Sequence, residues 1–135
     1  MTILLDTHVV IWALTNDPQL SEQARELISD PGNMVFVSTV SVWEIAIKNQ
    51  KAPRQCPYRE AEILKYCMDA GYMIMDIEPA HVLAVRTLDV KQDRTVANYD
   101  PFDRLLIAQA KSEGCLLLSH DRNFDNYDED CILII

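Results

Sequence analysis

Short, wholly apolar segments alternate with longer segments of helical periodicity along the chain. The apolar segments have the length of buried strands and predict strands at residues 3–5, 35–37, 72–77, 115–118 and 132–135. The segments between them predict helices at residues 7–14, 21–29, 41–50, 59–71, from 79 onward, and 101–114. Short apolar strands separated by helices favour a parallel sheet covered by helices on both faces, which is an α/β fold.

Turn residues and polar runs mark where these elements end. Gly71 is placed to end the fourth helix, and Pro53 and Pro57 break the chain before that helix begins. The polar segment 89–99 predicts a mobile loop. Because the chain has 135 residues, no internal repeat and no Gly/Ser linker, it predicts a single domain over its whole length.

Four acidic residues come at or near the carboxyl ends of the predicted strands. Asp6 and Asp121 each follow a strand, and Glu44 follows another by one helical turn. Asp103 lies at the start of the helix that precedes strand 115–118. Ligands of parallel sheets bind at the carboxyl ends of the strands, where the strand order reverses. We therefore expect these four carboxylates to converge at one edge of the sheet.

Such a group of carboxylates is costly when it is fully ionised. Two carboxylates about 6 Å apart repel by roughly 2–3 kcal/mol at an effective dielectric constant near 20. Over six pairs the cost is on the order of 10 kcal/mol, comparable to the stability of a whole domain. A divalent cation removes this cost, and an all-oxygen ligand set favours Mg²⁺ or Mn²⁺ over Zn²⁺. The four residues predict a metal site of this kind, provided that they converge.

Each carboxylate taken alone also has a structural interpretation. Ser41 and Glu44 match the S-x-x-E capping box of a helix start. Asp100 is a capping residue before a proline, with Asp103 favourably placed in the first turn of the same helix. The other two can cap a short turn and end a strand. For each residue on its own, these alternatives stay open.

The charge of the chain counts against a nucleic-acid partner. The net charge is −9, whereas nucleic-acid binders usually present a basic surface to the phosphates. The acidity suits a basic protein partner instead. One acidic cluster predicts a solvated loop that would attract such a partner, and it comprises Asp125, Asp128, Glu129 and Asp130.

Other features narrow the class of protein. The four cysteines show no C-x-x-C spacing, so they predict no zinc site, and Cys67, Cys115 and Cys131 are expected in the core. No apolar run approaches the roughly 18 residues that span a bilayer. The N-terminus lacks the basic region of a signal peptide, so we expect a soluble, cytoplasmic protein without a membrane partner.

Four segments carry the acidic residues in order: Ile3–His8 (ILLDTH), Ser41–Lys48 (SVWEIAIK), Asp100–Ala110 (DPFDRLLIAQA) and Leu118–Asp121 (LSHD). Together they resemble PIN-domain proteins, in particular the VapC-type toxins of bacterial toxin–antitoxin pairs. The DPFDRLLIAQA segment is the most specific of them. The resemblance implies a three-layer α/β/α sandwich with a five-stranded parallel sheet, and an endoribonuclease that depends on Mg²⁺ or Mn²⁺.

The resemblance also implies roles for single residues and partners. The catalytic and metal-binding acids of the family match Asp6, Glu44, Asp103 and Asp121. Two hydroxyl residues that support such a site match Ser119 and Thr7. It implies a homodimer and a small antitoxin whose C-terminal segment lies over the active site, and it makes transfer RNA a reasonable substrate. The sequence departs from the family at Asn98 and Tyr99, where a His is common, and in the short segment containing Pro53 and Pro57.

The predicted reaction is metal-assisted hydrolysis of an RNA phosphodiester, leaving 5′-phosphate and 3′-hydroxyl ends. Lys48 and Arg104 are candidate phosphate contacts, although each also has a structural interpretation as a helix ion-pair or first-turn residue. A rival chemistry would use His8 and His120 as an acid–base pair acting through the 2′-hydroxyl, leaving a cyclic phosphate.

A second alternative is a catalytically silent PIN-fold binding module that engages a protein partner. Its expected signature is the loss of one or more carboxylates, and none is lost here. Trp12 and Trp43 lie among apolar neighbours, so we expect them in the core or a dimer interface rather than as stacking platforms for bases.

Overall fold

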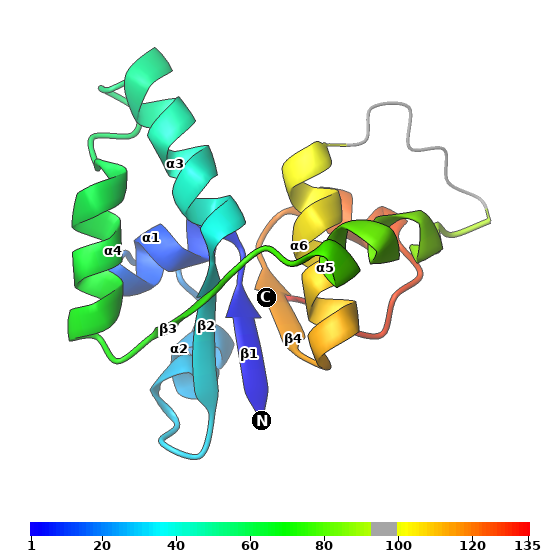
Figure 1. Cartoon of the computed structure of the whole chain (residues 1–135). Helices are drawn as coiled ribbons and strands as arrows, with labels where there is room; N and C mark the ends of the chain where they lie inside the picture. Colours follow the sequence, from blue (N-terminus) through cyan, green and yellow to red (C-terminus); the bar gives the residue numbers. More distant parts are fainter. Residues whose placement is uncertain (93–99) are drawn as a thin grey trace.

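The computed structural model describes residues 1–92 and 100–135, and at its centre is a parallel sheet of five strands. The strands, in the order β3-β2-β1-β4-β5 across the sheet, are β3 Met73–Met75, β2 Met34–Ser38, β1 Thr2–Leu5, β4 Leu116–Ser119 and β5 Ile132–Ile134. The chain first adds β2 and β3 on one side of β1, and later adds β4 and β5 on its other side. The order therefore reverses between β1 and β4, next to the middle of the sheet (Figure 1).

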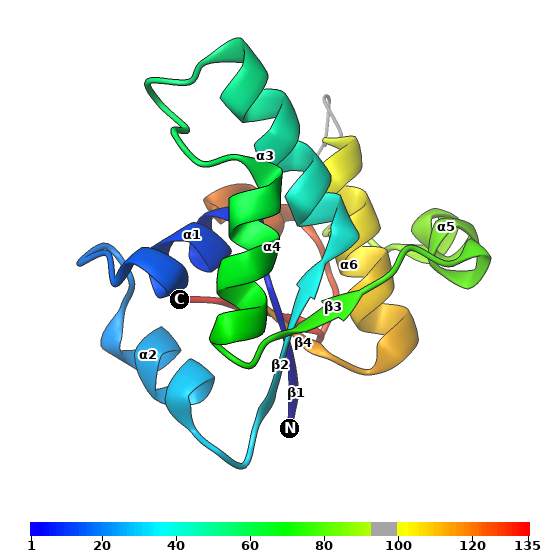
Figure 2. The same cartoon turned by 60° about the vertical axis from the view of Figure 1, so that its left-hand side comes forward.

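The helices form two layers on the sheet. Their bounds are α1 Thr7–Thr15, α2 Glu22–Ser29, α3 Thr39–Lys51, α4 Glu60–Asp69, α5 Pro79–Ala84 and α6 Pro101–Glu113, with short 3₁₀ turns η1 Val85–Thr87 and η2 Arg122–Asn126. Helices α1, α2 and α4 lie on one side of the sheet, and α5 and α6 on the other (Figures 1 and 2). The predicted three-layer α/β/α sandwich is confirmed.

Strand β1 shows why the sheet needs cover on both faces. Ile3 and Leu5 pack into a core with residues of α1, α2 and α4, whereas Leu4 packs into a second core with residues of α6. All three side chains are fully buried. Because successive side chains of a strand point to opposite faces, a continuous apolar run is stable only with helices on both sides.

The two edge strands are shorter than the sequence predicts. Residues 72–77 predict a longer strand than the observed β3, and the last residue of the chain lies outside β5. Strand β3 pairs with β2 alone, and β5 pairs with β4 alone. Apolar residues near an edge strand can pack against the core without joining the ladder, so the pattern overestimates the length of the strand.

Helix α3 begins two residues earlier than the sequence predicts. Strand β2 ends at Ser38, whose Oγ accepts a hydrogen bond from the backbone N–H of Val40 at 3.0 Å and caps the helix. Ser41 therefore lies inside α3, and the capping box that it would form with Glu44 is wrong. By contrast, Gly71 follows α4 as predicted, with a positive φ of 81°, and the N–H of Tyr72 donates to the carbonyl of Cys67.

Two predictions about side-chain burial need correction. Trp43 is 56% exposed and meets the Phe102 ring edge to face, so the core placement is wrong for this residue, whereas a dimer interface stays a prediction. Trp12 is half-buried and packs against the core that contains Ile3 and Leu5. Within the acidic cluster the Glu129 side chain is only 7% exposed and pairs with Lys111 at 2.6 Å, so this residue is not solvated as predicted.

The predicted mobile loop at 89–99 is described only in part. Val90 forms an isolated bridge with Tyr127, and Lys91 pairs with Asp125 at 3.0 Å. Residues 93–99, which include the departures at Asn98 and Tyr99, lie outside the described residues. The described start of the segment is thus joined to the chain that follows β4.

The remaining sequence predictions concern cysteines and membranes. All four cysteines are free thiols, with Cys67 and Cys115 buried and Cys131 partly so. Across residues 1–92 and 100–135, every helix is too short or too polar to cross a bilayer.

Candidate functional site

The four predicted carboxylates meet around Asp103, in the first turn of α6. The pKa of Asp103 is raised from its ordinary value to about 8, mainly by burial and in addition by four nearby carboxylates: Asp100, Asp6, Asp121 and Glu44, in decreasing order of effect. Carboxylates influence one another in this way only when they are close in space. The convergence expected at the reversal of strand order is therefore present in the structure.

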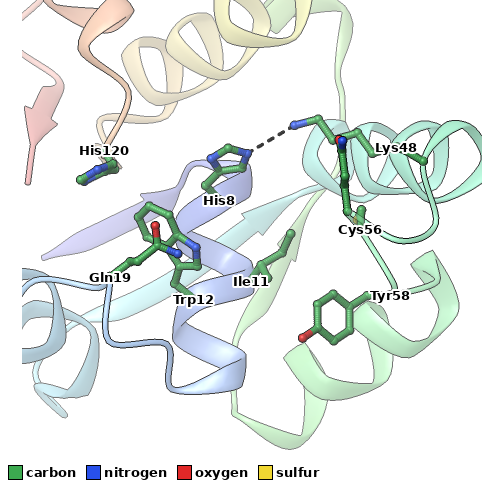
Figure 3. Close-up of a pocket in the computed structure, with 10 residues that line it drawn as sticks. His8, Ile11, Trp12, Gln19, Lys48, Cys56, Tyr58 and His120 are labelled. Carbon is green, nitrogen blue, oxygen red and sulfur yellow. Dashed lines mark hydrogen bonds between the residues drawn. The ribbon is translucent and has the colours of Figure 1, made fainter.

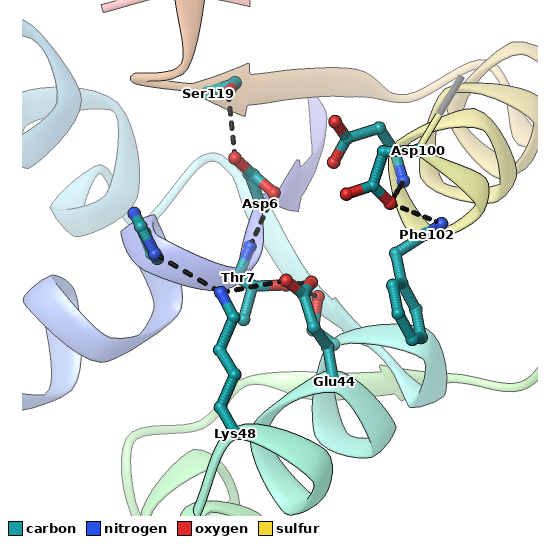
Figure 4. A network of polar contacts seen from close by, with 10 residues as sticks. Asp6, Thr7, Glu44, Lys48, Asp100, Phe102 and Ser119 are labelled. Carbon is teal, nitrogen blue, oxygen red and sulfur yellow. Dashed lines mark hydrogen bonds and ion pairs between the residues drawn. The ribbon is translucent and has the colours of Figure 1, made fainter. Parts of the chain in front are cut away.

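Asp6 is held in place by β1 and α1. The residue directly follows β1, caps α1, and is only 7% exposed. One carboxylate oxygen accepts the backbone N–H of Thr7 at 2.8 Å, and the other accepts the hydroxyl of Ser119 at 2.8 Å (Figure 4). These hydrogen bonds favour the charged form, but burial is the larger effect, and it raises the pKa of Asp6.

Ser119 connects two of the acids across the strand-order reversal. Its fully buried hydroxyl, at the end of β4, donates to Asp6 and accepts the backbone N–H of Asp121 at 3.0 Å. Asp121 itself is exposed, and one of its oxygens caps η2 by accepting the N–H of Asn123 at 2.9 Å. The capping interpretation of Asp121 is therefore correct, and it is compatible with a place in the site.

Glu44 reaches the site from α3, and hydrogen bonds from two other residues hold it there. The hydroxyl of Thr7 donates to Glu44 Oε1 at 2.7 Å, and Lys48 Nζ lies 2.9 Å from Glu44 Oε2. The Glu44 side chain is 13% exposed, and Thr7 is buried. Figure 4 shows this connected group of polar contacts running from Ser119 through Asp6 and Thr7 to Glu44 and Lys48.

Asp100 is a fifth carboxylate that the sequence identified only as a helix cap. It does cap α6, because its Oδ1 accepts the N–H groups of Phe102 and Asp103 at 2.8 and 3.3 Å. It also exerts the largest charge effect on the pKa of Asp103. The spacing D-x-x-D in the first turn of a helix was the available signal, since residues three apart share a helix face.

The arrangement fits a hard divalent cation. The five acidic residues of the site, Asp6, Glu44, Asp100, Asp103 and Asp121, offer carboxylate oxygens, which Mg²⁺ and Mn²⁺ prefer to nitrogen or sulfur. Lys48 compensates the charge of Glu44, whereas the high pKa of Asp103 shows that the site disfavours a further negative charge. A bound cation would reverse this preference and stabilise all the carboxylates in ionised form.

A second group of potential ligands lies elsewhere, where α5 meets α6. Ligand atoms of Glu78, His81 and Glu113 lie within 4.8 Å of one another. The buried ring of His81 accepts the backbone N–H of Glu78 at Nδ1, so a neutral ring carries its hydrogen on Nε2, which lies 2.8 Å from Glu113. Both ring nitrogens are thus occupied by protein groups, which favours a structural role over a metal site.

The basic residues that the sequence singled out are placed differently from one another. Lys48 lies against Glu44, and its Nζ is 3.5 Å from His8 Nε2. The guanidinium of Arg104 donates to the carbonyl of Val85 at 3.1 Å and lies 6.0 Å from the centre of the Tyr127 ring. The position of Arg104 favours its structural interpretation, whereas Lys48 is at the site.

The two histidines of the rival mechanism flank the ring of Trp12. The His8 and His120 rings have centroids 5.8 and 4.9 Å from that of Trp12, and both residues are exposed. His120 Nδ1 lies 3.2 Å from the carbonyl oxygen of Ile135. His8 and His120 thus lie close in sequence to Asp6 and Asp121, but both rings contact the indole of Trp12.

Comparisons with known proteins agree with this architecture. The family model described as "PIN domain" matches residues 3–130. A search of curated proteins gave no match.

Solved structures with the same fold include three whose sequences differ greatly from this one. VapBC2 from Rickettsia felis, bound to a DNA fragment from their promoter, has 16% identity and a TM-score of 0.69, covering 100% of this chain and 98% of that chain. DNA-bound VapBC from Salmonella typhimurium has 17% identity and a TM-score of 0.67, covering 99% and 98%. Mycobacterium tuberculosis VapC20, a sarcin–ricin loop cleaving toxin, has 15% identity and a TM-score of 0.52, covering 96% and 92%. At such identities the likeness establishes the fold.

Proposed function

Because this chain belongs to the PIN domain family, we propose that it is a Mg²⁺- or Mn²⁺-dependent endoribonuclease acting as the toxin of a toxin–antitoxin pair. The observation that carries the proposal is the convergence of Asp6, Glu44 and Asp121 on Asp103, whose pKa is raised to about 8. A site in which several carboxylates surround an acid with a raised pKa is suited to a divalent cation. The similar fold of VapC20, a sarcin–ricin loop cleaving toxin, supports the same reaction class.

In this proposal, the residues that would hold the cation are Asp6, Glu44, Asp103 and Asp121. When bound, a divalent cation would neutralise charge on the reacting phosphate and lower the pKa of a water molecule. The protein positions the ligands: Ser119 orients Asp6 and the backbone of Asp121, while Thr7 orients Glu44. Lys48, at the rim of the same group, is the candidate phosphate contact. Hydrolysis would leave 5′-phosphate and 3′-hydroxyl ends.

The proposed partners are an antitoxin and a second copy of this chain. The solved structures of similar fold include VapBC complexes and a toxin–antitoxin complex from Klebsiella pneumoniae. A basic antitoxin segment would find complementary charge on a chain of net charge −9. Apolar side chains exposed on α5, Val82 and Leu83, are available for a homodimer contact. Transfer RNA and the sarcin–ricin loop are the first two RNAs to test.

The nuclease proposal is tested by incubating the purified chain with these RNAs in Mg²⁺ or Mn²⁺, with and without excess EDTA. We expect cleavage only with the metal, and 5′-phosphate ends in the products. Cleavage that persists in EDTA and leaves a cyclic phosphate would favour the His8–His120 chemistry instead.

The silent-module alternative is tested in cells. Expression of the chain should inhibit growth, and Asp6→Ala should remove the inhibition, while Asp69→Ala, at an exposed position on α4, should not. Unchanged inhibition by the Asp6 variant would mean that binding a partner, and not cleavage, is the function.

A further inference from the structure

A pocket of about 550 Å³ opens beside the carboxylates, between α1 and the segment that joins α3 to α4. Its volume lies within the range of small-molecule and nucleotide sites, which is roughly 300–1,000 Å³. Ten residues line it: His8, Ile11, Trp12, Gln19, Lys48, Ala52, Gln55, Cys56, Tyr58 and His120 (Figure 3). The carboxylate site does not need this pocket for holding a metal ion, so its composition requires a separate explanation.

The pocket adjoins the carboxylate site through three of its lining residues. His8 lies two residues after Asp6 on α1, and His120 lies directly before Asp121. Lys48 lines the pocket and also contacts Glu44 at 2.9 Å. A group bound in the pocket would therefore lie next to whatever is bound by the carboxylates.

The chemistry of the wall is unlike that of the chain as a whole. The chain has 21 acidic residues, yet among the described residues that line the pocket there is no Asp or Glu. The wall combines a lysine and two histidines with an indole, a phenol and apolar side chains (Figure 3). Basic groups beside aromatic and apolar ones are what a nucleotide needs, since its phosphate is anionic and its base is flat and poorly hydrated on both faces.

We infer that this pocket binds one unpaired nucleobase of the RNA substrate, adjacent to the phosphodiester that is cut, with Trp12 as the stacking surface. Lys48 and His8 lie between the pocket and the carboxylates, where the phosphate of that nucleotide would be. Gln19 and Gln55 also line the pocket, and a glutamine amide carries both donors and acceptors for a base edge. This inference rests on the proposed function and adds a substrate requirement to it, because only a strand with an unstacked base fits.

The position of Trp12 suits this role. Its ring contacts the imidazoles of His8 and His120, whose centroids lie 5.8 and 4.9 Å away, and the His120 ring meets it edge-on. It is half-buried, so one part packs against the core while another part lines the pocket. From the sequence we expect Trp12 in the core or a dimer interface rather than as a stacking platform. The inference departs from that expectation, because an indole that packs against the core and also lines a pocket can stack on a base.

The inference is tested by comparing cleavage kinetics of Trp12→Leu, Trp12→Phe and wild type on short single-stranded RNA. For Trp12→Leu we expect KM to rise roughly 5- to 100-fold, the range for loss of one stacking aromatic, with kcat changed much less. Trp12→Phe should recover most of the loss. The control Tyr66→Leu removes a 43% exposed aromatic on α4 that does not line the pocket and should leave KM within about twofold.

A substrate-side experiment identifies the base. From a strand that wild type cuts, we would prepare versions that lack one base at successive positions around the cut. At one position, removal of the base should raise the KM of wild type, whereas the same removal should not change the KM of Trp12→Leu. If the wild-type chain cuts no RNA, the proposed function itself fails. If it cuts RNA and Trp12→Leu has the KM of wild type, as expected of a pocket for a protein segment, only the present inference fails.

A binding measurement covers the case in which Trp12→Leu does not fold. In a Trp43→Phe variant, Trp12 is the remaining tryptophan and reports directly on stacking through its fluorescence. Metal-free titration with short single-stranded RNA should quench this fluorescence, whereas an abasic strand of equal length and inorganic polyphosphate should not. Equal quenching by the abasic strand would overturn the inference, because the phosphates alone would then account for the signal.

Discussion

Two groups of carboxylates in this molecule differ in how their charge is compensated. At the junction of α5 and α6, Glu113 lies 2.8 Å from a ring nitrogen of buried His81, whose other nitrogen accepts a backbone N–H. At the strand-order reversal, Asp103 faces four further carboxylates, and its pKa is raised to about 8. The first group resembles a metal site by distance but is satisfied by the protein. The second is left with excess negative charge.

The difference shows that the spacing of ligand atoms is a poor guide to a metal site. In the first cluster, whose ligand atoms lie within 4.8 Å of one another, the histidine accepts a backbone N–H at the start of α5 and contacts Glu113 with its other ring nitrogen. The carboxylates around Asp103 come from separate elements, and hydrogen bonds from Ser119 and Thr7 hold Asp6 and Glu44 in place. Negative charge that the fold does not neutralise is the better indicator of a metal site, because a bound cation would supply the compensating positive charge.

The largest expected effect separates the two groups by activity. Asp103→Asn should lower RNA cleavage by at least about 100-fold, since loss of a ligand costs more than loss of the groups that orient it. Glu113→Gln should leave cleavage and Mn²⁺ affinity within about threefold. Both are measured by steady-state cleavage and by calorimetric Mn²⁺ titration. If Glu113→Gln removed Mn²⁺ binding instead, the assignment of the two groups would be reversed.

The next effect separates them by stability. His81→Leu should destabilise the chain by about 1–3 kcal/mol, because the buried His81 ring would no longer accept the N–H of Glu78 or contact the carboxylate of Glu113. The cost should be the same with and without Mn²⁺, as urea unfolding would show. A cost that grew with added Mn²⁺ would place the metal at His81.

The dependence of stability on pH should come from the carboxylate group. The folded chain holds the Asp103 proton more tightly than the unfolded chain, because its pKa is about 8 instead of 3.8. This contribution to stability is fully present below the unfolded pKa and is lost as the pH rises through about 8. The metal-free chain should therefore melt roughly 5–10 °C lower at about pH 8.5 than at about pH 5.5.

Mn²⁺ and one variant supply the controls for this measurement. Mn²⁺ should restore most of the lost melting temperature at the higher pH, because it binds the ionised carboxylates. Asp103→Asn carries no titrating group at this position, so its metal-free melting temperature should vary less with pH than that of wild type. Equal pH dependence in the variant would mean that other groups cause it.

The smallest effect tests the hydroxyl that connects Asp6 to Asp121. Ser119→Ala should reduce cleavage by about 10-fold, within the range for residues that orient metal ligands. Stability should change by only about 1 kcal/mol, the usual value of a buried hydroxyl hydrogen bond. Ser119→Thr, which keeps the hydroxyl, should recover activity if the enlarged side chain fits. A loss of stability without loss of cleavage would reduce Ser119 to a structural residue.

Much of the fold could be predicted because its signals are local. The apolar segments and the Pro and Gly positions at helix ends predicted the strands and helices, with errors mainly at edge strands and at the start of α3. That start was missed because Ser38, the last residue of β2, caps the helix directly, and sequence alone cannot separate a strand that ends in a cap from one followed by a loop.

The site was predicted less completely, for a different reason. The convergence of Asp6, Glu44, Asp103 and Asp121 was predicted from their position near strand ends and from the family resemblance, and their role as metal ligands stays a prediction. The contribution of Asp100 and the engagement of Arg104 by Val85 were not found. Both depend on where side chains at the start of α6 point. The periodicity of the sequence predicts a helix there, but only the packing of α6 on the sheet fixes which neighbours those side chains meet.

The sequence by itself determined that this chain folds as helices around a parallel sheet and that acidic residues follow its strands. Those properties follow from apolar periodicity and chain order, which need no knowledge of distant contacts. The tertiary structure alone decided which carboxylates lie close enough to raise the pKa of Asp103, that His81 contacts Glu113, and that Trp12 lines a pocket whose described lining residues include no Asp or Glu. These features depend on burial and on residues up to 113 positions apart, such as Asp6 and Ser119, which the pairing of β1 with β4 brings together.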